Sequence, residues 1–119
     1  ILNSSLFFIW WITNSDCYHL NKVEIANFNY KYDESIEIDA CAVAEKLAQD
    51  MKSNSIRRVY NYQTSGRVEY DEFYMKLSKP IIDEIDKILA VHYAFTEEEL
   101  DFIINYDIKY RMGDELNEE

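Results

Sequence analysis

The chain has 119 residues, the length of one ordinary globular domain, and 48% of them are apolar, which excludes disorder over most of its length. Only two glycines and one proline are present, so a mainly helical chain is favoured over a β-sandwich with many tight turns. The net charge of −11 repels phosphate, so nucleic-acid binding would require a segment whose local charge differs.

The N-terminal part contains seven consecutive apolar residues, LFFIWWI, from Leu6 to Ile12. This run is too short for a membrane span, which needs roughly 20 apolar residues, and no basic region precedes it as in a signal peptide. The run predicts a helix capped by Asn3 or Ser4, with apolar side chains on every side. Such a helix has to be covered all around by other protein, and no membrane contact is expected.

Two less regular segments are expected next. Residues 15–22 (SDCYHLNK) predict a loop, and residues 23–35 (VEIANFNYKYDES) predict short irregular or strand-like structure. Asp16, Cys17 and His19 could begin a metal site, but a structural zinc ion needs four ligands and the sequence offers no matching second pair. Cys17 and Cys41 are too few for a disulfide framework and favour reduced thiols in a cytoplasmic protein.

The middle of the chain predicts a helix followed by a β-hairpin. From Asp39 to Met51, apolar residues at Ala40, Ala44 and Leu47 recur at helical spacing, and KSNS then ends the helix. Residues 56–62 (IRRVYNY) and 67–73 (RVEYDEF) are rich in Val and Tyr and flank QTSG. They predict two antiparallel strands that turn near Ser65 and Gly66.

The C-terminal third predicts two helices. In residues 77–93, Ser78 can cap the helix, Pro80 suits its first turn, and Ile81, Ile85, Ile88 and His92 share one face with Ile82 and Leu89. In residues 95–106, Thr96 and Glu99 have the spacing of a capping box. The acidic tail, residues 113–119, has no apolar periodicity and is expected to be frayed or disordered.

These elements predict a mainly α member of the α+β class, with about four helices and one β-hairpin. Residues 1–112 are expected to form a single module, and residues 113–119 to follow it as a tail.

Little in the sequence points to catalysis. Gly66 and Gly113 are far apart, so no glycine-rich loop for a phosphate or a cofactor is expected. Asp107 and Lys109, in the triplet DIK, could form half of a metal-dependent nuclease site. They follow a helix, however, so the favoured interpretation is a helix terminus whose lysine suits the helix dipole. His92 lies on the apolar face of its helix and is interpreted as a core or boundary residue.

One segment differs from the rest of this acidic chain. Residues 51–68 contain no acid and carry four cations, with Tyr, Asn, Gln and Thr between them. Arginines can contact phosphate, and amides and tyrosines can contact bases and sugars. The candidate DNA-binding residues are Lys52, Arg57, Arg58, Gln63 and Arg67. The alternative is a solvated hairpin whose arginines pair with neighbouring acidic helices.

Residues 69–113, EYDEFYMKLSKPIIDEIDKILAVHYAFTEEELDFIINYDIKYRMG, closely resemble the C-terminal end of adenine-N6 DNA methyltransferases of bacterial type II restriction-modification systems. ILNSSLFFIWW at the N-terminus is similar to a helix of their target-recognition regions, and DCYHLNKVEIANF to the segment that follows it. KLAQDMKSNSIRRVYNYQTSGRV also fits the family pattern. The resemblance therefore covers nearly the whole chain.

The resemblance implies the distal part of a recognition region, within a larger enzyme that flips an adenine of duplex DNA and methylates it with S-adenosylmethionine. The family's Asn/Asp-Pro-Pro-aromatic loop and its glycine-containing cofactor motif have no counterpart here, because Pro80 is the only proline. No catalytic residue, metal or cofactor is therefore expected in this chain. Whether the parent enzyme also cuts DNA stays open.

The resemblance also bears on partners. The helix at Leu6–Ile12 is expected to be covered on one side by the helices from Asp39 onward and on the other by the upstream half of the parent polypeptide. Without that half, the exposed side should either pair with a second copy as a homodimer or remain as an apolar patch. The alternative function is an acidic helical protein-interaction module that does not contact DNA.

Overall fold

The structure is a computed structural model that describes residues 1–31 and 33–108. The elements in chain order are α1 (Ser5–Asn14), α2 (Lys22–Asn27), α3 (Glu34–Ser53), β1 (Ile56–Tyr62), β2 (Gly66–Glu72), the short 3-10 helix η1 (Met75–Ser78), α4 (Lys79–Tyr93) and α5 (Glu97–Asn105). The expectation of a mainly α chain of the α+β class with one β-hairpin is confirmed. The acidic tail, residues 113–119, lies outside the described residues.

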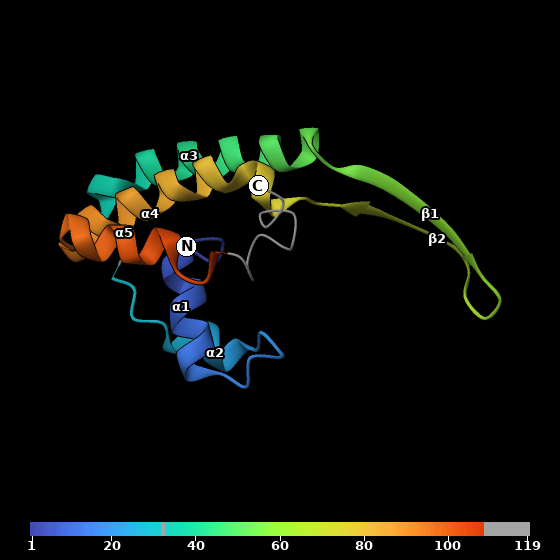
Figure 1. The fold of residues 1–119 in the computed structure, drawn as a ribbon, viewed down its shortest axis with the longest axis horizontal. Coiled ribbons are helices and arrows are strands. Elements are labelled where there is room, and N and C mark those ends of the chain that lie inside the picture. The colour runs from blue at the N-terminus through green and yellow to red at the C-terminus, as the bar shows by residue number, and fades with distance from the viewer. Residues whose placement is uncertain (32, 109–119) are drawn as a thin grey trace.

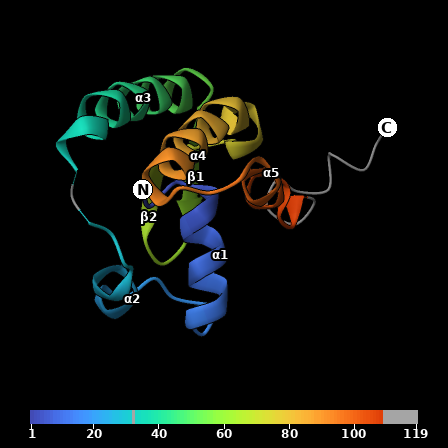
Figure 2. The same ribbon diagram turned by 90° about the vertical axis from the view of Figure 1, so that its left-hand side faces the viewer.

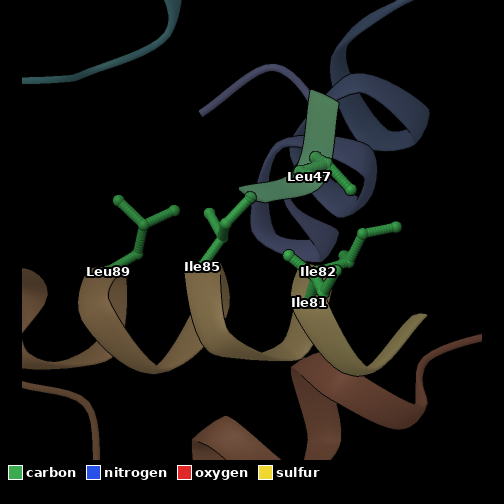
Figure 3. Packing of buried hydrophobic residues seen from close by; sticks show 5 residues of the cluster. All are labelled: Leu47, Ile81, Ile82, Ile85 and Leu89. Carbon is green, nitrogen blue, oxygen red and sulfur yellow. The ribbon is translucent and has the colours of Figure 1, made fainter. Parts of the chain in front are cut away.

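The core is formed where α3 and α4 run side by side (Figure 1). Leu47 of α3 faces a row of aliphatic side chains on α4 (Figure 3). The buried cluster consists of Leu47, Ile81, Ile82, Ile85 and Leu89. The aliphatic face predicted for α4 is therefore confirmed at these positions, and it holds the two long helices together by excluding water from their interface.

Helix α3 is longer than predicted at its N-terminus. It begins at Glu34 instead of Asp39, because the side chain of Asp33 accepts a hydrogen bond from the backbone N–H of Ser35 at 2.8 Å and caps the helix there. Its buried residues are Ile36 and Leu47. The extra turns thus bring Ile36 into the interior of the chain.

Helix α2 lies where irregular or strand-like structure was predicted, and that prediction is wrong for Lys22–Asn27. The side chain of Glu24 turns back and accepts a hydrogen bond from the backbone N–H of Asn21 at 2.9 Å. This local bond satisfies a donor that the first turn leaves open, and it favours a helix over the β-propensity of Val23 and Ile25.

Helix α1 is anchored at its N-terminus by one buried carboxylate. The N-cap Ser4 accepts from the N–H of Phe7 at 3.1 Å, as predicted, and Asp86 of α4 accepts from the N–H of Leu6 at 3.2 Å. Ser5 also donates to Asp86 through its backbone and side chain. Donors of the first turn are therefore satisfied across the α1–α4 contact.

Helix α1 is not enclosed within the described residues. It packs on α4 and α5, and only Phe7 among its apolar residues is buried, while Trp10 and Trp11 remain half-buried. Figure 2 shows α1 beneath α4, with α5 at one side. Helices α4 and α5 thus cover one side of α1, as expected, and the expected second cover by an upstream part of the parent polypeptide stays a prediction. Within the described part of the chain, no helix is long and apolar enough to span a bilayer.

The hairpin of β1 and β2 leaves the helical body between α3 and α4 and extends away from it (Figure 1). The strands pair antiparallel, with Ile56 opposite Glu72 and Tyr62 opposite Gly66. Gly66 has a φ of 70°, a conformation that a side chain disfavours, so glycine suits the turn. The predicted strands and the predicted turn are confirmed.

Candidate functional site

The projecting hairpin, called here the β-arm (residues 56–72), holds most of the predicted DNA-binding residues. Polar contacts of Arg58 tie the two strands together at its base and reach the residue just before η1. Arg58 Nε donates to Glu72 Oε2 at 2.5 Å, and Arg58 Nη2 donates to the Tyr74 hydroxyl at 3.3 Å. These bonds raise the pKa of the Arg58 guanidinium, Glu72 contributing most, so Arg58 stays charged. The β-arm thus leaves the body from a tied base.

A second contact behind the β-arm joins α3 to the start of α4. Ser78, which was predicted to cap α4, lies at its N-cap position, but its hydroxyl donates to Asp50 Oδ2 at 2.7 Å instead of capping the helix. Ser78 is fully buried. The two helices that flank the β-arm are therefore bonded to each other directly below its base.

One face of the β-arm is charged. The register and the alternation of side chains place Arg57, Val59 and Asn61 on this face, opposite Asp71, Glu69 and Arg67. Arg57 bonds to Glu69 at 3.0 Å and to Asp71 at 3.1 Å, and both raise its pKa. Arg67 pairs with Glu69 at 2.5 Å. Among the described residues, Arg57 and Arg58 thus pair with acids of the opposite strand, and Arg67 pairs with Glu69 of its own strand. The alternative expectation, pairing of these arginines with acidic helices, is not seen in this part of the chain.

These pairs change the charge of the candidate site. The acid-free stretch carries three arginines within the β-arm, and β2 supplies three acids, Glu69, Asp71 and Glu72, that face them. The β-arm as a whole is therefore close to neutral. Sequence reasoning considered the four cations without their cross-strand neighbours, although the predicted hairpin register already brings RVEYDEF opposite IRRVYNY.

The other face of the β-arm is aromatic. Tyr60 and Tyr70 stack with ring centroids 5.9 Å apart, and Tyr62 lies 6.2 Å from Tyr60. All three rings remain exposed to solvent. Partial desolvation and a hydrogen bond with Tyr60 raise the pKa of Tyr70, so its hydroxyl stays protonated and can donate. Tyr70 was missed by sequence reasoning because it lies outside the acid-free stretch.

The predicted DNA-binding residues fall into two groups. Lys52 lies in the last turn of α3, and Arg57 and Arg58 lie at the base of the β-arm. Gln63 is exposed in the turn, and Arg67 follows it at the start of β2, with its side chain 67% exposed. The distal half, residues 60–68, contains no acid. Only Gln63 and Arg67 are therefore presented together by the end of the β-arm.

Other candidate chemistry finds little support in the arrangement of the described residues. Asp107 adopts a left-handed backbone conformation with φ of 49°, while Lys109, its proposed nuclease partner, lies outside the described residues. Over residues 1–31 and 33–108, no group of three or more His, Cys, Asp or Glu side chains is placed to hold a metal ion.

His92 lies at the junction of α4 with α3, as a boundary residue. Its ring packs against Tyr30 and Tyr93, with centroids 5.3 Å and 4.9 Å away. Its Nδ1 lies 3.8 Å from Asp33 Oδ2, too far for a hydrogen bond. The His92 ring therefore lies among tyrosine rings, with the Asp33 carboxylate within ion-pair distance but outside hydrogen-bond distance.

Comparison with known proteins adds no relative to this description. The chain matches no known protein-family model, no curated protein and no solved structure. Any function of this chain has to be inferred from its residues and from their arrangement.

Proposed function

We propose that this chain is a non-catalytic DNA-recognition module of an adenine-N6 DNA methyltransferase from a bacterial restriction-modification system. The parent enzyme would supply the S-adenosylmethionine site, the catalytic loop and the upstream half of the recognition region. The cytoplasm is the compartment that such an enzyme would share with its DNA. The resemblance of residues 69–113 to that family is one support, and the geometry of the β-arm is the other.

The single observation that carries the proposal is the projection of an acid-free β-arm tip from an acidic body. The major groove of duplex DNA admits a two-stranded β-ribbon. The β-arm extends beyond the helices along the long dimension of the molecule, which measures 52 Å (Figure 1). Its tip can therefore approach a groove while the acidic helices stay further from the phosphates.

The tip carries the side chains that this role requires. Gln63 and Asn61 offer amides that can bond base edges, and Arg67 offers a guanidinium for a phosphate or a guanine. Among the described residues, Arg67 pairs with one acid, Glu69, and this exposed ion pair contributes little stability. A DNA phosphate can therefore replace Glu69 at small cost, whereas Arg57 is held by two carboxylates.

The proposal predicts a graded effect of mutations along the β-arm. Arg67→Ala and Gln63→Ala should weaken duplex binding, and Arg67→Ala should also reduce the slope of log affinity against log salt by roughly 0.9 per lost phosphate contact. Arg57→Ala should have a smaller effect on affinity, because that guanidinium serves Glu69 and Asp71. Fluorescence anisotropy of a labelled duplex, measured from low to moderate salt, gives both quantities.

Lys46→Ala is the matched control, because Lys46 pairs with Glu84 on the helical body at 2.9 Å and lies away from the β-arm. Its loss should leave DNA affinity and salt slope unchanged. If Arg67→Ala and Lys46→Ala behave alike, or if the folded chain binds no duplex at low salt, the β-arm is not a DNA-binding element.

The second candidate function is an acidic protein-interaction module. One observation favours it: the arginines of the β-arm are neutralised by β2, while apolar side chains of α1 stay half-buried at the surface. The duplex-binding measurement separates the two candidates, because an interaction module would bind protein and would leave duplex DNA unbound at every salt concentration.

A further inference from the structure

Two adjoining apolar grooves lie on the surface formed by α1, α5, the segment at residues 28–29 and the end of α4 with the residues that follow it. The first has a volume of about 330 Å³ and is lined by Ile9, Trp10, Phe28 and Tyr93, among others. The second has a volume of about 350 Å³ and is lined by Phe102 and Ile103 with Glu98 and Glu99. Phe95 lines both, so the two grooves adjoin at this residue, and together they are called here the α1–α5 groove.

The α1–α5 groove is apolar at its floor and open to solvent. Phe102 is 61% exposed although it is a large aromatic residue, and Trp10 is half-buried. Aromatic side chains of this kind, gathered in one concave surface, are typical of places where a partner docks. Their exposure is costly in water, and a matching apolar surface would relieve that cost.

The two charged residues that line the α1–α5 groove within the described chain are both acids. Helix α1 contains no charged residue, and α5 contains four acids and no lysine or arginine. Glu98 and Glu99 line the second half of the groove directly, while Glu97 and Asp101 are exposed on the same helix. A partner with exposed carboxylates would be repelled here, and a partner with ammonium or guanidinium groups would be attracted.

We infer that the α1–α5 groove docks a cationic amphipathic helix, with its apolar stripe on Trp10, Phe95 and Phe102 and its lysines or arginines beside the acids of α5. A helix presents apolar side chains at i, i+3, i+4 and i+7 along one stripe, which suits an elongated groove with two compartments. The flanking cations of such a helix complement Glu98 and its neighbours. This site lies on the helical body and does not depend on the DNA contact proposed for the β-arm.

The direct test uses a synthetic peptide of about 18 residues, made of leucine at amphipathic spacing and lysine elsewhere. One control peptide has the same composition in scrambled order, and the other has glutamate in place of lysine. The reporter is the indole of Trp10 in a Trp11→Phe variant, because Trp11 lines a different groove with Phe8 and Leu20. The lysine peptide should bind and change the Trp10 emission, and both control peptides should bind at least about tenfold more weakly.

Variants of the chain locate the binding. Phe102→Ala should weaken the lysine peptide about tenfold, because the aromatic anchor is lost. Glu98→Gln should weaken it at low salt and have little effect at high salt. The matched controls are Val91→Ala, an apolar residue that is 77% exposed on α4, and Glu45→Gln, an exposed acid on α3; both should leave binding unchanged.

Three results would overturn the inference. The first is no binding of the lysine peptide to the folded chain, and the second is equal binding of the glutamate peptide. The third is self-association of the chain that Phe102→Ala abolishes, because a second copy would then be the occupant. Arg67→Ala serves as the cross-check: it should leave peptide binding unchanged, so failure of the DNA proposal and failure of this inference are distinguishable.

Discussion

At the scale of single residues, Asp86 is the most unusual position in the chain. Its carboxylate is 2% exposed and accepts hydrogen bonds from the first turn of α1, while its Oδ2 has no hydrogen-bond partner among the described residues. Burial is the largest influence on it and raises its pKa above the usual 3.8, although Ser5 and Leu6 act in the opposite direction. Burial therefore makes the charged form less favourable in the folded protein than it is in water.

This shift predicts a decline of stability with pH. Below pH 3.8 the Asp86 carboxyl is protonated in both the folded and the unfolded chain. As the pH rises above 3.8, the carboxyl of the unfolded chain releases its proton first. The free energy of unfolding therefore falls until the carboxyl of the folded chain has ionised too. In Asp86→Asn, which keeps an oxygen for the N–H of Leu6, that part of the decline should be absent.

Urea unfolding of both proteins at several pH values between 3.8 and 7 measures this difference. The free energy of unfolding of Asp86→Asn should rise relative to that of the wild type as the pH increases. The control is Asp39→Asn on the exposed surface of α3, which should show no such trend. A constant difference between wild type and Asp86→Asn would show that Asp86 does not titrate differently on folding.

At the scale of elements, the packing of α3 on α4 decides which face of α3 contributes to stability. Leu47 is 4% exposed in the core, whereas Ile38, on the same helix, is 79% exposed. Leu47→Ala removes buried methyl groups and leaves a cavity, so it should cost about 2–5 kcal/mol of unfolding free energy. Ile38→Ala should change stability by less than about 0.5 kcal/mol, because it removes no packing.

Chemical denaturation of the two variants at one pH tests this assignment. Both changes shorten an aliphatic side chain to alanine in the same helix, so helix propensity contributes little to the difference between them. Similar losses at the two positions would mean that α3 packs on α4 through a different face.

The elements that local sequence determines were predicted well. The β-hairpin, the Pro80-containing start of α4 and the capping box of Thr96 and Glu99 all appear in the structure, because turn chemistry and caps act within a few residues. The incorrect predictions, for α2 and for the start of α3, concern elements set by single side-chain hydrogen bonds that the apolar spacing of the sequence does not show. Glu24 converts an expected irregular segment to α2, and Asp33 starts α3 early, each through one hydrogen bond.

The candidate site was predicted in part for the same reason. The sequence shows that residues 51–68 lack acids, but the charge that a ligand meets depends on the opposite strand. Glu69 and Asp71 are close in sequence to the acid-free stretch, and only the register of β1 and β2 turns them toward Arg57. Asp86 was hidden for a related reason, because its partners are the N–H groups of a helix 80 residues away in sequence.

At the scale of the whole molecule, the chain combines an acidic helical body, a nearly neutral β-arm and a partly covered α1. Trp10 lines the α1–α5 groove, and Trp11 lines a smaller groove with Leu2, Phe7, Phe8 and Leu20. Full burial of a large aromatic side chain removes about 150–250 Å² from water, which at about 25 cal/mol per Å² is about 4–6 kcal/mol. Two half-buried indoles leave a substantial part of that stabilisation unrealised.

The folded chain should therefore bind a hydrophobic fluorescent dye under native conditions, at neutral pH and before any unfolding. Trp10→Ser should reduce the dye signal because it removes an apolar side chain from the α1–α5 groove, and Trp11→Ser should reduce it in the same way at the smaller groove. The double variant should reduce the signal further, because the two grooves lie on different sides of α1. Val91→Ser is the control, since Val91 is exposed singly and lines neither groove. Dye emission measured alongside a cooperative urea transition separates native-state binding from binding to a loosely packed state. A folded wild-type chain that binds no dye would show that both indoles are covered in solution, and sedimentation would then test whether a second copy is the cover.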